Sequence, residues 1–215
     1  IRKVQMGPEK KSKVMSDRAK RLTAYHEAGH AVAAHFCGHT DPVHYITIIP
    51  RGPSGGATYF RPKEDLENFH SYSELFENIV VSLGGRLSEK LFLDDISTGA
   101  SGDIQQASSL ARAMITQYGM SEKLGPISFD SSEHSIFIGR DFGQTKSYSE
   151  ETAALIDEEV KRLFDEASAR CEKILTEHQD LVRGVAEYLL VNESMDGEDF
   201  AYFCDHGVLP KKKEK

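Results

Sequence analysis

The chain has 215 residues, of which 39% are hydrophobic and 28% are charged. A chain of this length can bury a core and fits one domain, with or without a helical appendage. It contains no run of eighteen apolar residues, so we expect a soluble protein in which no segment crosses a bilayer. The three cysteines are far apart and form no CxxC pair, which argues against a disulfide framework or a thiolate zinc site and favours a reducing compartment.

The net charge of −8 is unevenly distributed along the chain. Residues 1–21 carry eight Lys and Arg against two acids, and the chain ends in KKKEK. No aromatic interleaving or binding motif accompanies these basic ends, so we expect solvated segments and no nucleic-acid partner. We interpret residues 1–15 as a basic linker and residues 206–215 as a basic tail. The start at Ile1, without a signal-peptide pattern, leads us to expect a fragment of a longer chain.

The first predicted helix runs from about residue 16 to residue 36 and contains the sequence HEAGH. Ser16 supplies an N-cap, and the segment is apolar almost all the way round, which is typical of a buried helix. His26 and His30 lie one turn apart on one face, so each can give a ring nitrogen to a single zinc ion at ~2.1 Å. Glu27 lies beside that face, where its carboxylate can take a proton from a zinc-activated water and pass it to a leaving amine. The motif therefore predicts a metallopeptidase; two hydrogen-bonded core histidines are the alternative.

The next two segments predict a β-hairpin. Residues 43–50 (VHYITIIP) are rich in β-branched and aromatic residues, and a glycine-rich loop separates them from ATYF. We interpret Ala57, Thr58, Tyr59 and Phe60 as a candidate edge strand that binds an extended peptide by antiparallel pairing. Backbone hydrogen bonds of this kind would tolerate many substrate sequences. An ordinary hairpin strand without that role is the alternative.

A second helix is predicted over residues 71–92, with Gly84 and Gly85 in its interior. Interior glycines cost a helix ~1 kcal/mol each relative to Ala, so their presence indicates close packing against another element. Ser101 is the expected N-cap of a third helix, and a short strand is expected near residues 135–139.

From residue 148 the pattern changes to long helices. Ser147 and Glu150 fit a capping box, and apolar residues then recur at three- and four-residue spacing. A further helix is expected from about residue 180 to 191, and a short one after Asp196. Pairs of opposite charge at i,i+4 mark the exposed face of the long helix, namely Asp157 with Lys161, Glu158 with Arg162, and Glu166 with Arg170. These elements predict a mainly α fold with a small β-hairpin or sheet, in which a zincin-type HExxH helix precedes a C-terminal helical bundle.

A catalytic zinc ion needs a third protein ligand and an open position for water. The HExxHxxGxxH pattern is excluded, because Ala33 and Phe36 stand where it requires glycine and histidine. His35 points about 140° away from His30 around the helix. His39 and His44 fall beyond the end of the helix. All three are better explained as surface or core polar groups.

Two carboxylates remain as third-ligand candidates. Glu89 lies in GGRLSEKLF, where the glycines would let the second helix approach the metal. Asp103 lies in STGASGDIQQA, in the first turn of the third helix, whose N-terminus would keep the carboxylate ionised. Ordinary complementation of the helix dipole explains Asp103 equally well, so the residues alone leave this choice open.

Three separate segments resemble the peptidase domain of the FtsH family of ATP-dependent zinc metalloproteases. They are MGPEKKSKVMSDRAKRLTAYHEAGHAVAAH, GGRLSEKLF and STGASGDIQQASSLARAMITQYGMSEKLGPISF, and the similarity covers residues ~2 to ~200. The resemblance implies that His26, His30 and Asp103 bind one Zn²⁺ per chain and that Glu27 is the catalytic base. Lys90 departs from the second glutamate found in many relatives, at a position outside the proposed ligands.

The resemblance also implies a larger assembly. Residues 16–205 would be the zinc metallopeptidase domain, and residues 1–15 would link it to an upstream ATPase module and membrane segments outside this sequence. ATP and the membrane would then act only through those parts, in a homo-oligomer of hexameric ring form at the cytoplasmic face of the bacterial inner or plasma membrane. The implied substrates are unfolded or membrane-extracted polypeptides. A ring-forming oligomerisation module with a vestigial metal site, or a small-molecule zinc hydrolase, would be separated from this interpretation by a peptide-digestion assay.

Overall fold

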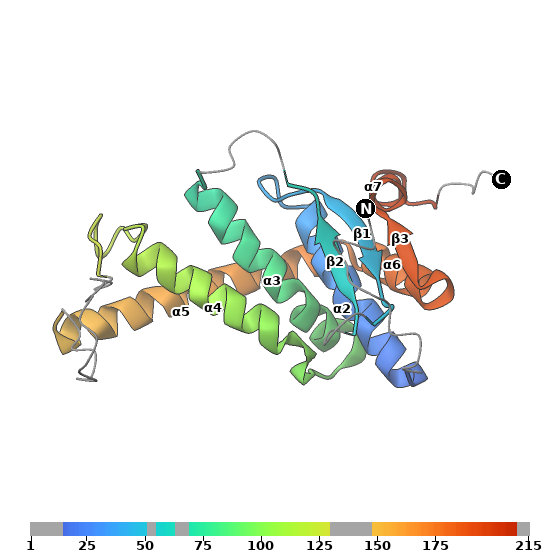
Figure 1. The fold of residues 1–215 in the computed structure, drawn as a ribbon, viewed down its shortest axis with the longest axis horizontal. Helices are drawn as coiled ribbons and strands as arrows, with labels where there is room; N and C mark the ends of the chain where they lie inside the picture. The colour runs from blue at the N-terminus through green and yellow to red at the C-terminus, as the bar shows by residue number, and fades with distance from the viewer. Residues whose placement is uncertain (1–14, 51–54, 63–68, 130–147, 210–215) are drawn as a thin grey trace, which may run out of the picture.

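The computed structural model describes residues 15–50, 55–62, 69–129 and 148–209. These residues are mainly helical with a small antiparallel sheet, as the sequence predicted. The helices are α2 (Asp17–His35), α3 (Tyr72–Leu93), α4 (Ser101–Thr116), α5 (Glu150–Glu177), α6 (Gln179–Asn192) and α7 (Gly197–His206). The short elements are β1 (Val43–Thr47), β2 (Ala57–Phe60), β3 (Ser194–Asp196) and a 3-10 turn, η1 (Thr98–Ala100). The sheet lies beside α2, whereas α3, α4 and α5 pack against one another on the other side of the molecule (Figure 1).

Helix α2 is the buried centre of the domain. The Ser16 hydroxyl caps it by accepting a hydrogen bond from the Ala19 N–H, and most of its residues from Thr23 onward are buried. Its main neighbour is α3, which crosses it at two glycines. A Cβ on Gly29 would lie 2.3 Å from the carbonyl oxygen of Gly84, so both residues must be glycine for the backbones to come this close. The predicted close packing of the interior glycines is confirmed.

The sheet has the strand order β2-β1-β3, with both pairs antiparallel. The predicted hairpin of β1 and β2 is therefore confirmed, with Ile46 opposite Thr58 and a register irregularity between Val43 and Tyr45. The sequence did not predict β3, because a three-residue strand between two helices carries too few residues to show a period of two. Among the described residues, β2 is an edge strand whose far side has no neighbouring strand.

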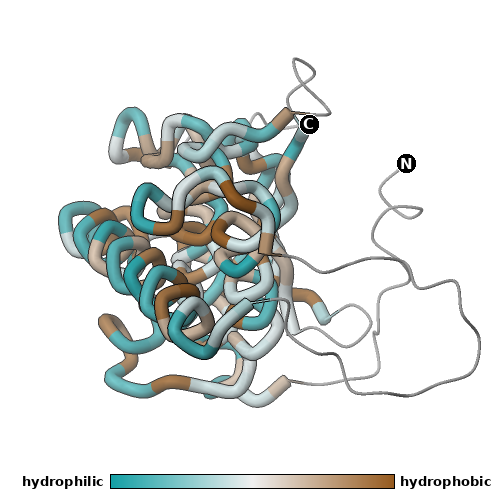
Figure 2. Tube along the Cα trace, turned by 90° about the vertical axis from the view of Figure 1, so that its left-hand side faces the viewer, coloured by the Kyte–Doolittle hydropathy of each residue, from teal (hydrophilic) through white to brown (hydrophobic). Residues whose placement is uncertain are grey.

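The helices around α2 bury one continuous apolar core. Buried residues of α5 lie at the spacing that the sequence indicated, from Ile156 through Leu163 and Ala167 to Leu175. Hydrophilic residues follow the outer turns of the helices and hydrophobic ones gather between them (Figure 2). In the described parts of the chain, no helix is both long enough and apolar enough to span a membrane.

Two predicted helix caps are wrong. The cap of α5 is Ser149, which accepts from the Thr152 N–H, whereas Ser147 lies outside the described residues. Ser101 does not cap α4, because η1 runs directly into that helix and gives Ser101 helical dihedral angles. The side chain that caps this region is Ser97, which accepts from the Gly99 N–H. The strand expected near residues 135–139 also lies outside the described residues.

The three ion pairs predicted along α5 are wrong as well, because their members have other partners. Lys161 pairs with Asp165 and Arg162 with Glu159 and Glu166, all within α5. Asp157 pairs with Arg112 of α4, Glu158 with Lys123, and Arg170 with Glu77 of α3. Spacing along one helix cannot predict such pairs, since they depend on how the helices pack.

Candidate metal centre and active site

His26 and His30 lie one turn apart on α2 and point their Nε2 atoms at each other, 3.0 Å apart. Their other ring nitrogens are held from α3: the Nδ1 of His26 lies 2.6 Å from Glu89 Oε1, and the Nδ1 of His30 lies 2.7 Å from the Val81 carbonyl oxygen. Gly85 makes this possible, since a Cβ there would lie 2.5 Å from the His26 ring. Both rings are buried, so their orientation is fixed by packing and by these two hydrogen bonds.

The partners of the two Nδ1 atoms decide the tautomers of the neutral rings. A carbonyl or carboxylate oxygen can only accept, so each Nδ1 must carry the proton. Each Nε2 of a neutral ring then presents a lone pair. His26 and His30 thus direct two lone pairs to the same point, which is the arrangement of a histidine pair prepared for a metal ion.

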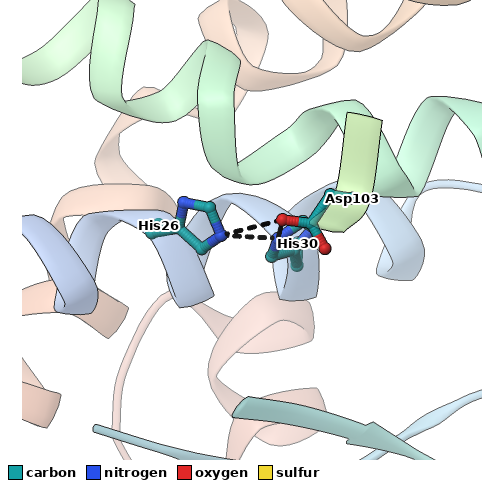
Figure 3. A group of neighbouring side chains, drawn as sticks. All are labelled: His26, His30 and Asp103. Atoms are coloured by element: carbon teal, nitrogen blue, oxygen red, sulfur yellow. Dashed lines mark hydrogen bonds and ion pairs between the residues drawn. The ribbon is translucent and has the colours of Figure 1, made fainter. Parts of the chain in front are cut away.

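Asp103 brings a third acceptor atom to that point. It lies in the first turn of α4, and its Oδ2 is 3.3 Å from the Nε2 of His26 and 3.6 Å from the Nε2 of His30 (Figure 3). A tetrahedral zinc ion at ~2.0–2.1 Å from each ligand separates the ligand atoms by about 3.3 Å. The three observed separations lie on both sides of this value, so the donor set fits zinc in type and in spacing.

The close contacts in the cluster shift the pKa values of His26 and Asp103 in opposite directions. Burial lowers the pKa of His26, but the hydrogen bonds with Asp103 and Glu89 outweigh that effect and raise it to about 10. Burial raises the pKa of Asp103, but its hydrogen bonds with the two histidines hold it well below its usual range. A centre that binds a proton this strongly favours positive charge, and a metal cation competes for the same place.

Glu89, the other third-ligand candidate, lies behind His26 and not at the cluster. Its side chain is buried; Oε1 accepts from His26 and Oε2 accepts from the Ser97 N–H at 2.7 Å. Burial raises the pKa of Glu89, but these hydrogen bonds lower it further than burial raises it, so the carboxylate stays ionised. Because Ser97 belongs to the segment that leads into α4, Glu89 connects His26 with the turn that carries Asp103.

Glu27 lies next to the cluster on α2 and is 5% exposed. Its Oε2 accepts a hydrogen bond of 2.7 Å from the Thr58 hydroxyl of β2. Burial raises the pKa of this carboxyl, and the charges of His30 and His26 and the Thr58 hydrogen bond reduce that rise without cancelling it. A raised pKa suits a group that must take up a proton and release it again.

An open cavity of about 970 Å³ adjoins the His26, His30 and Asp103 cluster and Glu27. His26, His30, Asp103 and Glu27 line it together with residues of β2, α3 and α4. Of the predicted substrate strand, Ala57, Thr58 and Phe60 line the cavity, whereas Tyr59 packs toward Tyr45 of β1 with ring centroids 6.4 Å apart. The volume is typical of a ligand cleft, and the edge strand forms one of its walls.

The remaining candidate histidines contact other parts of the molecule. His35 faces Asp205 of α7, His39 faces Glu77 of α3, and His44 lies 3.0 Å from Arg61. The sequence interpretation of these residues as polar groups apart from the metal site agrees with these positions.

Two contacts of the site were missed by sequence reasoning. The Val81 carbonyl that holds His30 gives no signal, because any residue offers a backbone carbonyl. The Thr58 hydroxyl gave a weak signal, because Thr58 was assigned to the substrate-binding strand, but nothing in the sequence indicated a contact with Glu27.

Comparison with known proteins places the chain in a family. The profile of peptidase family M41 matches residues 13–203. The ATP-dependent zinc metalloprotease FtsH 1 of Thermoanaerobacter sp. (strain X514) is 51% identical over 200 residues, which is 93% of this chain and 33% of the relative. ATP-dependent zinc metalloprotease FtsH of Bacillus subtilis (strain 168) is 42% identical over 211 residues, 98% of this chain and 33% of the relative. The chain therefore spans about a third of the length of these curated relatives.

The family match covers the HEAGH helix, the glutamate helix and the turn that carries Asp103, so it includes every residue of the cluster. It agrees with the chemistry of that cluster, since three acceptor atoms at zinc spacing adjoin a buried glutamate. The chain belongs to peptidase family M41, the metallopeptidase family of the FtsH zinc metalloproteases.

Proposed function

We propose that residues 16–205 form a zinc-dependent endopeptidase domain in which His26, His30 and Asp103 hold one Zn²⁺ per chain. The observation that carries this proposal is the convergence of three acceptor atoms within 3.0–3.6 Å of one another. Three acceptors repel one another unless a proton or a metal cation lies between them, and a zinc ion can bind all three at once. Two imidazoles and one carboxylate are a common ligand set for a catalytic zinc ion that keeps one position open.

Within this proposal Glu27 is the general base and then the general acid. A bound zinc ion would polarise the scissile carbonyl and lower the pKa of the attacking water toward ~7. Glu27 would take the proton of that water and pass it to the amine of the leaving peptide. Its position beside the cluster, on the wall of the cavity, supports this role.

We further propose that the substrate is an extended polypeptide that pairs with β2. The strand is at the edge of the sheet, and its residues Ala57, Thr58 and Phe60 line the same cavity as the cluster. Pairing through the backbone gives affinity without demanding one sequence. Folded proteins offer an extended segment only after local opening, so unfolded chains should be the preferred substrates.

For the longer protein, the names of the relatives suggest coupling to ATP. We propose that the parent is a hexameric ring at the cytoplasmic face of a bacterial membrane, with an ATPase module that delivers unfolded chains to this domain. The peptidase domain alone should then cleave an unstructured protein with or without ATP, and leave a tightly folded protein intact in both conditions. Destruction of the folded protein by the peptidase domain alone, stimulated by ATP, would contradict this division of tasks.

Hydrolysis of an unstructured fluorogenic peptide tests the domain itself. We expect activity with zinc, loss on treatment with a chelator, and recovery when zinc is restored. Glu27→Gln should keep the zinc and the fold while kcat falls by about 10²–10⁴-fold, because the amide cannot accept the proton of the water. Substantial cleavage by Glu27→Gln would show that Glu27 is not the base.

A further inference from the structure

A single hydroxyl connects the edge strand to the proposed base. Thr58 lies in the middle of β2, and its Oγ1 is 2.7 Å from Glu27 Oε2 and 3.2 Å from the Glu27 carbonyl oxygen. A threonine hydroxyl has one proton to donate, and the shorter contact, to a charged acceptor, is the stronger one. In the part of the chain that the structure describes, no other residue donates a hydrogen bond to this carboxylate.

Gly56 explains how β2 comes so close to Glu27. A Cβ at this position would lie 3.0 Å from Glu27 Oε1, 2.6 Å from Thr23 Cγ2 and 2.7 Å from the Thr47 carbonyl oxygen. Two of these contacts are shorter than real Cβ atoms make, and one of them is to backbone that cannot easily move. The strand therefore passes directly over the glutamate, with Gly56 beside one carboxylate oxygen and Thr58 bonded to the other.

A glutamate needs such a contact if it is to act as a base. Its side chain has several rotatable bonds, so an unheld carboxylate samples many positions. Proton transfer requires the carboxylate within hydrogen-bond reach of the water, and a misplacement of about 1 Å costs on the order of 10²-fold in rate. The helix fixes the backbone of Glu27, and the Thr58 hydroxyl is the contact that fixes the end of its side chain.

We propose that Thr58 is a positioning residue for peptide hydrolysis, which holds the Glu27 carboxylate at the cavity wall and links its orientation to the strand on which the substrate lies. This inference rests on the proposed function, because Thr58 acts through Glu27. A polypeptide paired with β2 would then meet a base that is positioned by the same strand. The alternative is that the hydroxyl only fastens β2 to α2, in which case removing it would weaken the fold or peptide binding but not the chemical step.

The test compares kcat and KM of Thr58→Val and Thr58→Ser with those of the wild type, using an unstructured fluorogenic peptide and protein of verified zinc content. Valine has nearly the shape of threonine without the hydroxyl, whereas serine keeps the hydroxyl and loses the methyl group. We expect kcat of Thr58→Val to fall on the order of tenfold with KM within about twofold, because a hydrogen bond to a charged group is lost. Thr58→Ser should restore most of kcat.

Thr40→Val is the matched control, since the buried Thr40 hydroxyl donates to the backbone carbonyl of Ala34 on α2, the helix that carries Glu27, and neither Thr40 nor Ala34 lines the cavity. It should lower the melting temperature and leave kcat unchanged. Adding Thr58→Val to Glu27→Gln should cause no further loss of residual hydrolysis, because the group through which Thr58 acts has been altered. An unchanged kcat in Thr58→Val, a rise in KM alone, an equal loss in Thr58→Ser, or an additive loss in the double variant would overturn the inference while Glu27 remains the base. Full activity of Glu27→Gln would instead overturn the proposed function.

Discussion

Helix α3 buries two glutamates about three turns apart, and they serve different parts of the molecule. Glu77 is 2% exposed and Glu89 is 1% exposed, and both accept hydrogen bonds from two residues. Glu77 binds the guanidinium of Arg170 at 2.6 Å and the His39 N–H at 2.6 Å. Glu89 binds His26 and the Ser97 N–H.

The two glutamates differ in what else their partners contact. Arg170 carries a permanent charge, so its pair with Glu77 is complete and joins α3 to α5. His26 has a second nitrogen, which points into the cluster with His30 and Asp103. Burial and a lowered pKa are common to both glutamates, so neither property alone marks a functional site. Glu89 differs from Glu77 because its partner, His26, also belongs to the cluster with His30 and Asp103.

The largest effect on zinc content should come from removing one of the two histidine ligands. We expect His26→Ala and His30→Ala to fall from about one zinc equivalent per chain to nearly none, because two protein ligands hold zinc much more weakly than three. His39→Ala, which removes a histidine that faces Glu77, should keep its zinc. Metal analysis of the purified variants measures this, and full zinc retention in both ligand variants would contradict the proposed site.

Glu89→Gln should weaken zinc binding by about 10–100-fold without abolishing it. The amide has one acceptor oxygen, so either His26 or the Ser97 N–H would face an NH₂ group and lose its partner. Competition with a chelator of known affinity measures the change. Glu77→Gln makes the same chemical change on the same helix, and an equal loss of affinity in that variant would remove the distinction between the two glutamates.

Glu77→Gln should instead lower the free energy of unfolding, by about 1–3 kcal/mol, since it breaks a charge-assisted pair between α3 and α5. Urea unfolding at neutral pH measures this change. Asp165→Asn removes an exposed partner of Lys161 and should change stability by less than about 0.5 kcal/mol. Equal effects of the two substitutions would show that burial of the Glu77 pair does not matter.

The stability contribution of Glu77 should also depend on pH. Burial raises the pKa of this carboxyl, but the hydrogen bonds from His39 and Arg170 bring it below its ordinary value of 4.5. A pKa lower in the folded state stabilises the fold above about pH 4.5, and this stabilisation is lost as the pH falls through the folded-state pKa. The comparison is made in metal-free protein that carries His39→Ala in both forms, so that no imidazole charge next to Glu77 changes with pH. The stability difference between Glu77 and Glu77→Gln should then be constant from pH 7 to pH 5 and shrink at lower pH. A difference that grows on acidification would contradict the sign of this pKa shift.

The sequence predicted the elements that have a long periodic pattern or a defined spacing. Helix α2 was expected at residues 16–36 and is found at Asp17–His35, with Ser16 as its cap. His26 and His30 could be placed together because they lie one turn apart on one helix. Gly84 and Gly85 indicated close packing, and they prove to face α2 and the His26 ring.

The features that the sequence could not predict depend on contacts between distant segments. Arg170 was expected to pair with Glu166 along α5, but the packing of α5 on α3 brings it to Glu77. The residues left Glu89 and Asp103 open as third ligand, because both are acids in helices that follow α2. Only the fold shows that Asp103 meets the Nε2 atoms while Glu89 meets the far side of His26.

The zinc content of Asp103→Asn and Glu89→Gln, measured side by side at saturating zinc, tests the proposed ligand set most directly. If His26, His30 and Asp103 are the ligands, Asp103→Asn should hold well below one equivalent, whereas Glu89→Gln should fill to about one equivalent despite its weaker affinity. The opposite result would contradict the account: if Glu89→Gln holds no zinc while Asp103→Asn holds a full equivalent, Glu89 is the third ligand.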